Sequence, residues 1–346
     1  MSKTLQDYAI LINDTIQSNE INHYITTANM CQNLGGIDTF KNINIPQGKV
    51  RSFQKDDVLL SNIRLYFRKV YRAKQKGGCS SDVLVFRAKH IDSATLFAIL
   101  SSQIFTDYAC SGSQGFKMPR GNKTHMMDFK IPTINFTIAK IFNNIQNKIE
   151  NNHKINELLH TLAYKIYEYY FKYKPKNAKL EQIIIENPKS SIMVKNAQKT
   201  QDKYPFFTSG DNILFYPKAI IDGRNCFLNT GGNAGIKFYV GKASYSTDTW
   251  CICANEFSDY LYLLLSSIKT HINQSFFQGT SLKHLQKNLL KKYPIYMPSA
   301  HEIKKFNQII MPLLTLISIN TRTSKNLEQI RDFLLPLLLK QQVKPQ

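Results

Sequence analysis

The strongest constraint on the fold of this sequence is an internal repeat with a period of about 166 residues. A Ser/Thr-Asp step (CSSD at residues 79–82, YSTD at 245–248), a leucine before two serines, a Gln-Gly step and a proline occur in the same order in both halves. The matched pairs are Cys79 and Tyr245, Leu100 and Leu265, Gln114 and Gln278, and Pro132 and Pro298. Their offsets of 166, 165, 164 and 166 residues indicate a duplication. A duplicated chain of 346 residues predicts two similar folding units.

Each copy carries the same series of predicted elements. Short runs of β-branched and aromatic residues predict strands at residues 58–61 and 83–86 in the first copy, and at 212–216 and 237–240 in the second. A helix is expected to follow at residues 93–105 and again at 258–271. A polar loop containing glycine and an exit proline come next in both copies. The two units should therefore share one mixed α/β architecture.

Each copy ends in a long stretch with helical periodicity. The first begins after Pro132 and runs to about Phe171, and its apolar residues alternate at spacings of four and three, as in a coiled coil. Asn152 and Asn156 fall in this seam, where asparagine usually fixes the register of paired helices. The second stretch covers about residues 301–340. We expect Pro312 to kink this helix or delay its start, and Pro336 to fray its end.

The order of head, helix, head and helix predicts the fold class. It is an α+β protein with two similar mixed α/β domains, separated by two long antiparallel coiled-coil helices and related by a pseudo-two-fold axis. A helix of about 35 residues is roughly 50 Å long, so antiparallel helices would place the two heads at opposite ends of a rod. Such an object suits a DNA duplex, whose backbone is itself two-fold symmetric.

The charge of the chain points to a polyanionic partner. Lys and Arg number 45 against 24 Asp and Glu, which gives a formal net charge of +21. Self-repulsion of this size is usually offset by nucleic acid, and next most often by a membrane surface. An AT-rich genome, which raises the lysine content, is a third explanation that the composition leaves open.

The order of domains resembles that of the specificity subunits of type I restriction–modification systems, and the likeness covers essentially the whole chain. Residues 148–158 (KIENNHKINEL), followed by the aromatic run at 167–171, are similar to the first helical region of that family. Residues 57–64 (DVLLSNIR) and 204–210 (YPFFTSG) resemble strands of its target-recognition domains. One departure is that the acidic-Gln step often found after the exit proline is missing here, which leaves the alignment of the helix starts open.

The resemblance implies a domain organisation and a function. Residues 1–135 and 181–300 would be two target-recognition domains, and residues 136–180 and 301–346 two conserved helical regions. The chain would be a non-catalytic DNA-recognition subunit without a cofactor, which reads a bipartite target on double-stranded DNA. Its partners would be two methyltransferase subunits, with room for restriction or translocase subunits. A specificity subunit of a related system with a fused methylase–nuclease partner fits the same plan.

No motif in the sequence supports catalysis. Residues 186–189 (ENPK) lack the second proline and the aromatic residue that an adenine methyltransferase uses to hold the exocyclic amine. The glycine-rich residues 230–235 (TGGNAG) are more typical of a hairpin turn than of a cofactor loop, and no P-loop is present. Residues 128–130 (DFK) lack the upstream carboxylate of a metal nuclease. The six cysteines have no zinc-site spacing, so we expect reduced, buried thiols and no metal.

The location of the protein follows from features that are missing. The N-terminal stretch has no apolar segment of a secretory signal, and no run approaches the roughly 18 apolar residues of a spanning helix. We therefore expect a cytoplasmic protein without a membrane partner. A methyltransferase or nuclease fragment, and a structural or membrane-surface protein, remain the alternatives from other functional classes.

Candidate DNA-contacting residues are polar or basic side chains in expected loops and strand ends. Arg and Lys favour guanine, Asn and Gln favour adenine, and other cations hold phosphates. Residues 74–78 are expected to be a hairpin tip, with Lys76 available to a phosphate. In the first copy the candidates are Arg64, Tyr66, Arg68, Lys69, Lys76, Ser113, Gln114, Lys117 and Arg120. In the second copy they are Thr208, Ser209, Asn233, Gln278, Thr280, Ser281 and Lys283.

Overall fold

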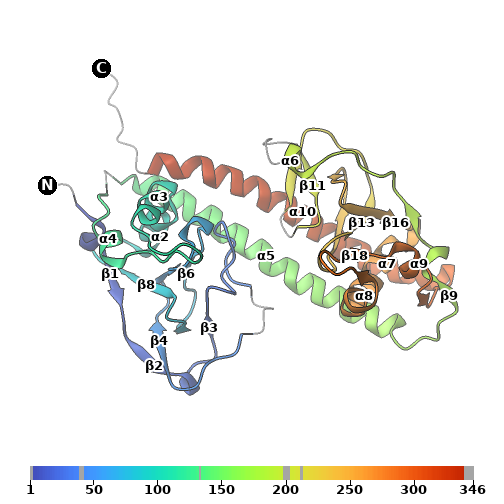
Figure 1. Ribbon diagram of the computed structural model, residues 1–346, viewed down its shortest axis with the longest axis horizontal. Coiled ribbons are helices and arrows are strands. Elements are labelled where there is room, and N and C mark those ends of the chain that lie inside the picture. Colours follow the sequence, from blue (N-terminus) through green and yellow to red (C-terminus); the bar gives the residue numbers. More distant parts are fainter. Residues whose placement is uncertain (1–2, 39–42, 132–133, 198–202, 211–212, 339–346) are drawn as a thin grey trace. The chain divides into compact units, whose positions relative to one another are not determined.

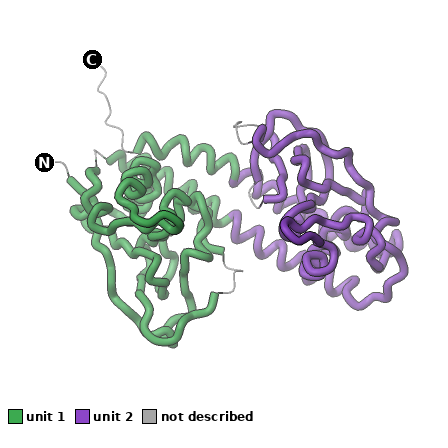
Figure 2. The backbone as a smooth tube through the Cα atoms, viewed as in Figure 1, with its two compact units in different colours: residues 1–151, 325–346 green, residues 152–324 purple. Residues whose placement is uncertain are grey.

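The computed structural model describes residues 3–38, 43–131, 134–197, 203–210 and 213–338. Pro132 of the repeat and Asn212 of an expected strand lie outside these residues. The chain divides into two compact units, residues 1–151 with 325–346, and residues 152–324 (Figure 2). Helices α5 (Phe136–Phe171) and α10 (Ala300–Leu338) each contribute a segment to both units. The expected mixed α/β character is confirmed.

Unit 1 contains two four-stranded sheets, ordered β1-β8-β5-β6 and β2-β4-β7-β3. Helices α2 and α3 cover the first sheet (Figure 1). Its strands are β1 (Ala9–Ile12), β2 (Thr15–Gln17), β3 (Tyr24–Ile25), β4 (Lys49–Phe53), β5 (Val58–Ser61), β6 (Val70–Arg72), β7 (Gly77–Cys79) and β8 (Val83–Ala88). Its helices, apart from the segments of α5 and α10, are α1 (Leu5–Tyr8), α2 (Ser93–Ser101), α3 (Gln103–Ser111) and α4 (Lys123–Met127), with 3-10 turns η1 (Ser18–Glu20) and η2 (Leu65–Phe67).

Strand β5 is buried on both faces, which explains why its sequence is continuously apolar rather than alternating. Val58 and Leu60 point into the core beneath α2 and α3, whereas Leu59 points into a second core. Strand β8 divides its side chains in the same way. Because successive side chains of a strand point to opposite faces, each of these strands contributes to both cores.

In unit 2 the sheet ordered β10-β16-β13-β14 repeats the order of the β1-β8-β5-β6 sheet, whereas a second sheet has three strands, ordered β12-β11-β15. Its strands are β9 (Ala178–Lys179), β10 (Ile185–Glu186), β11 (Tyr204–Phe207), β12 (Leu214–Tyr216), β13 (Arg224–Asn229), β14 (Ile236–Val240), β15 (Ser244–Tyr245), β16 (Thr249–Cys253), β17 (Phe277–Gln278), β18 (His284–Leu285) and β19 (Pro294–Ile295). Its helices are α6 (Val194–Ala197), α7 (Ser258–Ser267), α8 (Lys269–Ser275) and α9 (Lys287–Lys291), with 3-10 turns η3 (Leu180–Gln182) and η4 (Asn255–Phe257).

The repeat seen in the sequence is visible as repeated strand pairing. Strand β3 pairs in parallel with β7, and β11 pairs in parallel with β15. In these pairs Ile25 lies opposite Cys79, and Phe207 lies opposite Tyr245. Cys79 and Tyr245 are one of the four matched pairs of the repeat, so the sequence offset and the structural equivalence agree.

The helix expected at residues 93–105 is wrong in extent, because it is two helices. Helix α2 ends at Ser101, Ser102 is extended, and the Ser102 hydroxyl accepts a hydrogen bond from the Phe105 amide at 3.2 Å. Ser102 is thus the N-cap of α3. Serine is favoured at N-cap positions, so a new helix begins here instead of α2 continuing. The helix expected at residues 258–271 is likewise divided, with α7 and α8 separated at Ile268.

Of the two effects expected at Pro312, a kink or a delayed start of the second long helix, the delayed start is also wrong. Helix α10 begins at Ala300 and continues through Pro312. Ile310 and Leu314, on either side of the proline, are buried in the core of unit 2. This packing offsets the roughly 3 kcal/mol that an interior proline costs a helix.

A capping box defines where α10 begins. The Glu302 carboxylate accepts hydrogen bonds from the Ser299 amide at 2.9 Å and from the Tyr296 hydroxyl at 2.8 Å, and the Ser299 hydroxyl accepts one from the Glu302 amide at 3.3 Å. The reciprocal pair satisfies amides that the first turn leaves without helical partners. These bonds, led by the Ser299 amide, lower the pKa of Glu302 from its ordinary 4.5 to about 2.

We expect Glu302→Gln to reduce the acid sensitivity of the protein. A carboxylate with a lowered pKa in the folded state stabilises the fold above pH 4.5, and this contribution is lost as the pH falls from 4.5 towards about 2. The variant should be less stable at pH 7, by about 0.5–1 kcal/mol as for other caps, and should lose less stability over that pH range. Urea unfolding at several pH values, with the exposed Glu181→Gln as control, measures both effects. Equal acid sensitivity of wild type and Glu302→Gln would contradict this assignment.

Within unit 2 the two long helices run in opposite directions and are joined by buried and partly buried polar contacts. The Asn152 amide donates to the Ser324 hydroxyl at 3.2 Å, and the Asn156 amide to the Thr321 hydroxyl at 3.3 Å. Asn320 donates to the Asn156 oxygen at 3.0 Å. These contacts give Asn152 and Asn156, noted in the sequence, a partner on the facing helix.

Among the residues described, none of the helices is long and apolar enough to cross a membrane. All six cysteines are free, and burial raises the pKa of the Cys79 thiol to about 12.

Candidate nucleic-acid interface

A seven-residue loop, Gln114 to Arg120, projects from unit 1 and is closed by the backbone at its base. The Gln114 and Arg120 amides donate to each other's carbonyl oxygens, at 2.9 and 2.8 Å. Gly115 has a φ of +101°, a conformation that favours glycine and that turns the chain into the loop. The loop is thus closed at its base rather than being a free coil.

The fold brings a second segment, residues 62–66, against this loop. The Arg64 amide donates to the Pro119 oxygen at 2.9 Å, and the Gly121 amide donates to the Asn62 oxygen at 3.2 Å. Arg64 itself has a φ of +51° and precedes the 3-10 turn that leaves Tyr66 half exposed. Two segments that were singled out separately in the sequence therefore form one surface.

The loop surface of unit 1 combines cations with exposed apolar side chains. Lys117 is exposed, and the Arg64 guanidinium donates to the Lys117 backbone oxygen at 3.3 Å. The Arg120 guanidinium is held by the Asp82 carboxylate at 3.1 Å while remaining more than half exposed. Phe116 is fully exposed. Such a mixture of cations, amides and apolar groups is typical of surfaces that contact DNA bases and phosphates.

The same loop recurs in unit 2 with different side chains. Gln278 pairs with His284, just as Gln114 pairs with Arg120. The Gly232 amide donates to the Lys283 oxygen at 2.9 Å, and the Leu285 amide donates to the Thr230 oxygen at 3.0 Å. These bonds match those that hold the loop of unit 1, at constant offsets along the two segments. Thr280, Ser281 and Lys283 are all exposed on this second loop.

The turn beside the second loop lies between β13 and β14. Because these strands pair antiparallel, residues 230–235 form the expected hairpin turn. Asn233 is exposed at this turn. Ser209 donates to the Asp248 oxygen and accepts from the Thr230 amide at 3.3 Å, so it supports the turn from beneath.

Four sequence candidates have their side chains engaged within their own unit. The Arg68 guanidinium donates to the Ser101 oxygen at 2.9 Å, and the Lys69 ammonium donates to the Thr27 oxygen at 2.6 Å. Burial lowers the pKa of Arg68. Thr208 is buried, and its hydroxyl accepts from the Gly210 amide at 3.0 Å. The Ser113 hydroxyl donates to the Ala109 oxygen at 3.0 Å.

The hairpin tip expected at residues 74–78 is wrong. Strands β6 and β7, on either side, belong to different sheets, and Gly77 and Gly78 lie inside β7 and are buried. A Cβ at Gly77 would lie 2.5 Å from the His23 backbone oxygen, so glycine is needed for close strand packing. Lys76 is exposed in the connection between the two sheets.

Four further residues of the two loops are exposed or paired beside the sequence candidates and were not among them. Phe116, Met118 and Leu282 are more than half exposed, and His284 occupies the position equivalent to Arg120. Counting outward from the repeated Gln-Gly step would have aligned both loops residue by residue. An exposed apolar side chain, however, cannot be told from a buried one in an irregular segment by its sequence.

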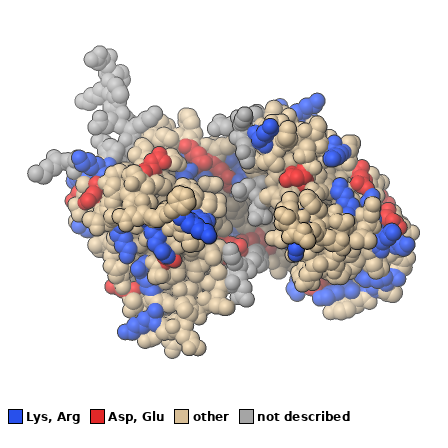
Figure 3. Space-filling model, viewed as in Figure 1, with Lys and Arg blue, Asp and Glu red and all other residues tan. Residues whose placement is uncertain are grey.

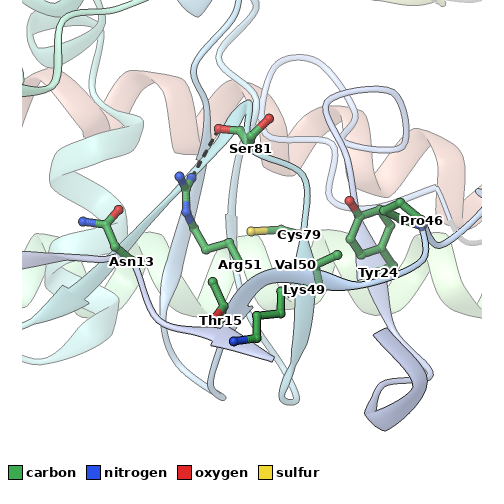
Figure 4. A pocket seen from close by; sticks show the side chains of 9 residues that line it. All are labelled: Asn13, Thr15, Tyr24, Pro46, Lys49, Val50, Arg51, Cys79 and Ser81. Carbon is green, nitrogen blue, oxygen red and sulfur yellow. Dashed lines mark hydrogen bonds between the residues drawn. The ribbon is translucent and has the colours of Figure 1, made fainter. Parts of the chain in front are cut away.

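A separate pocket of about 360 Å³ lies between strands of unit 1 (Figure 4). Arg51 lines it and donates to the Ser81 oxygen at 3.3 Å. The pocket is also lined by Cys79, whose raised pKa keeps its thiol protonated and therefore a poor nucleophile. The lining residues are Asn13, Thr15, Tyr24, Pro46, Lys49, Val50, Arg51, Cys79 and Ser81, which include no acid–base pair for catalysis.

Within the described parts of the chain, no three His, Cys, Asp or Glu side chains are grouped so as to hold a metal.

Comparison with known proteins agrees with the resemblance seen in the sequence. Residues 176–329 match the model of the type I restriction modification DNA specificity domain. None of the curated proteins matches the chain. The crystal structure of a type I restriction–modification S subunit from M. genitalium is similar, with a TM-score of 0.64 and 14% identity over 99% of this chain and 96% of that chain. The HsdS subunit from Thermoanaerobacter tengcongensis gives a TM-score of 0.37 and 13% identity over 98% of this chain and 96% of that chain. The chain therefore matches the type I restriction–modification DNA specificity domain over residues 176–329, and its fold is similar to that of a type I S subunit.

Proposed function

We propose that this protein is the DNA specificity subunit of a type I restriction–modification complex and reads a bipartite target. The observation that carries the proposal is the recurrence of one hydrogen-bonded loop in both units, with different side chains at its tip. Residues 114–120 present an aromatic ring and cations, whereas residues 278–284 present hydroxyls, a lysine and a histidine. Two loops of equal backbone and unlike chemistry suit two unlike half-sites.

The domain organisation follows from this function. Residues 1–135 and 181–300 serve as two target-recognition domains, related by a pseudo-two-fold axis. Residues 136–180 and 301–346 serve as helical regions that form an antiparallel coiled coil. The net charge of +21 supports DNA as the partner, and lysine and arginine side chains are spread over the face drawn in Figure 3.

Helix α5 offers a surface for protein partners. Ile155, Leu158, Leu162 and Tyr169 are all at least 40% exposed in unit 2. Their spacings of three, seven and fourteen residues from the first place them on one face of the helix. An exposed apolar stripe of this kind is typical of protein interfaces. We assign it to the methyltransferase subunits, of which two bind each chain in the cytoplasm, and restriction or translocase subunits complete the assembly. The chain itself binds no cofactor and catalyses no reaction.

Paired substitutions at the two equivalent glutamines test the proposal. In the complex of this chain with its methyltransferase, Gln114→Ala should weaken recognition of one half-site and Gln278→Ala recognition of the other. Each loss should be about 1–3 kcal/mol in binding free energy if the amide contacts a base edge. Both residues are exposed, so the fold should be unaffected.

The measurement is competition binding with duplexes altered in one half-site at a time. Calorimetry of the chain alone with S-adenosylmethionine provides the control for the absence of enzyme activity. Binding of the cofactor by the lone chain, or equal effects of both variants on both half-sites, would count against the proposal.

A further inference from the structure

Three apolar side chains, on the unit 1 loop and on the turn beside it, are largely exposed, although the Tyr66 ring packs edge-on against Phe67. Phe116 is 106% exposed relative to a free residue, and Tyr66 and Met118 are 53% and 54% exposed. None of the three belongs to a core cluster of unit 1 or packs at the edge of one. Their apolar surface is therefore available to a partner.

The loop that carries Phe116 is rigid enough to present it. Two hydrogen bonds between Gln114 and Arg120 close the base, and the Arg64–Pro119 and Gly121–Asn62 bonds hold the segment that leaves the loop. A ring on a braced loop loses little freedom on binding, which favours a defined contact over a loose one.

The cations around Phe116 favour DNA as the partner, and its exposed apolar ring favours the major groove. Lys117 follows Phe116 directly, and Arg120 and Arg64 lie at the base of the same loop. The base edges in the minor groove display only hydrogen-bonding groups, so an apolar side chain finds an apolar partner only in the major groove, which is about 12 Å wide. The apolar group that the major groove displays on unmodified DNA is the 5-methyl of thymine.

We propose that Phe116 reads the 5-methyl group of a thymine in the half-site bound by unit 1, with Met118 and Tyr66 flanking the contact. This inference rests on the proposed function and names the base chemistry that this loop selects. Thr280 occupies the position of Phe116 in the unit 2 loop, so this aromatic contact is absent from the other half-site.

The test uses the complete complex of the chain with its methyltransferase and duplexes bearing the target that the complex methylates. The half-site of unit 1 is the one that Gln114→Ala weakens. Each thymine in it is replaced in turn by deoxyuridine, which removes only the methyl group. One replacement should weaken binding by about fourfold, the amount for one buried methyl. The variant Phe116→Ala should weaken binding by at least as much and should no longer distinguish thymine from deoxyuridine at that position.

Two variants control for indirect effects. Phe116→Leu, which keeps an apolar group, should retain part of the thymine preference, and Glu181→Ala, at an exposed position outside both loops, should leave it unchanged. A half-site without thymine, or a Phe116→Ala complex that still distinguishes the two bases, overturns the inference. So does fluorescence of 2-aminopurine showing that Phe116 unstacks a base pair instead. A complex with no sequence preference at all would refute the proposed function, whereas intact specificity without deoxyuridine sensitivity refutes only the role of Phe116.

Discussion

Replacing Asp259 with alanine should lower the free energy of unfolding by about 3–5 kcal/mol, because it leaves a partly buried arginine without its counter-ion. Asp259 is 1% exposed, and its carboxylate accepts from both the Nε and the Nη2 atoms of Arg224. Arg224 also donates to the Thr315 hydroxyl at 3.0 Å, so the pair joins strand β13 and helices α7 and α10. Burial raises the pKa of Asp259, and the bonds from Arg224 oppose this shift.

Urea unfolding measures this effect, and two further variants identify its cause. Glu168→Ala removes two helical ion pairs, with Lys165 and Lys172, and should change stability by less than about 1 kcal/mol. The double variant Arg224→Met with Asp259→Leu removes both charges and should recover most of the loss. If Asp259→Ala lowers the free energy of unfolding no more than Glu168→Ala does, the Asp259–Arg224 pair does not contribute to stability as described.

Exchange of residues 1–135 for the first domain of another type I specificity subunit should change one half of the DNA target completely and leave the other half intact. The two loops lie in separate compact units, each with its own core. A half-site read by one unit should therefore depend on that unit alone. Each mismatched base pair typically costs about 1–3 kcal/mol of binding free energy. Several mismatches together should therefore abolish binding to the old half-site.

Mapping of methylated adenines in cells carrying the intact and exchanged systems gives the result directly. The reciprocal exchange of residues 181–300 serves as the matched control and should alter only the other half. A single continuous target, or an exchange that alters both halves together, would falsify the two-domain assignment.

The sequence alone determined the features that depend on local pattern and on duplication. The extent of α5 followed from apolar spacing, because a helix repeats its contacts every three to four residues. The repeated Gln-Gly step marked both loops. Its glycines, Gly115 and Gly279, have a positive φ in the structure, a conformation that favours glycine. Strand β5 was evident from its continuous apolar run.

Only the tertiary structure decided which distant segments meet and which side chains they leave free. Arg64 and Pro119 are adjacent through a backbone hydrogen bond, although 55 positions separate them in the chain. Arg68 and Lys69, equally basic in the sequence, turn inward to carbonyl oxygens, whereas Lys117 and Phe116 remain exposed. The spacing of apolar residues along the sequence predicts which face of one helix or strand is buried. The availability of a side chain for DNA depends instead on long-range packing and hydrogen bonding, which the order of residues does not record.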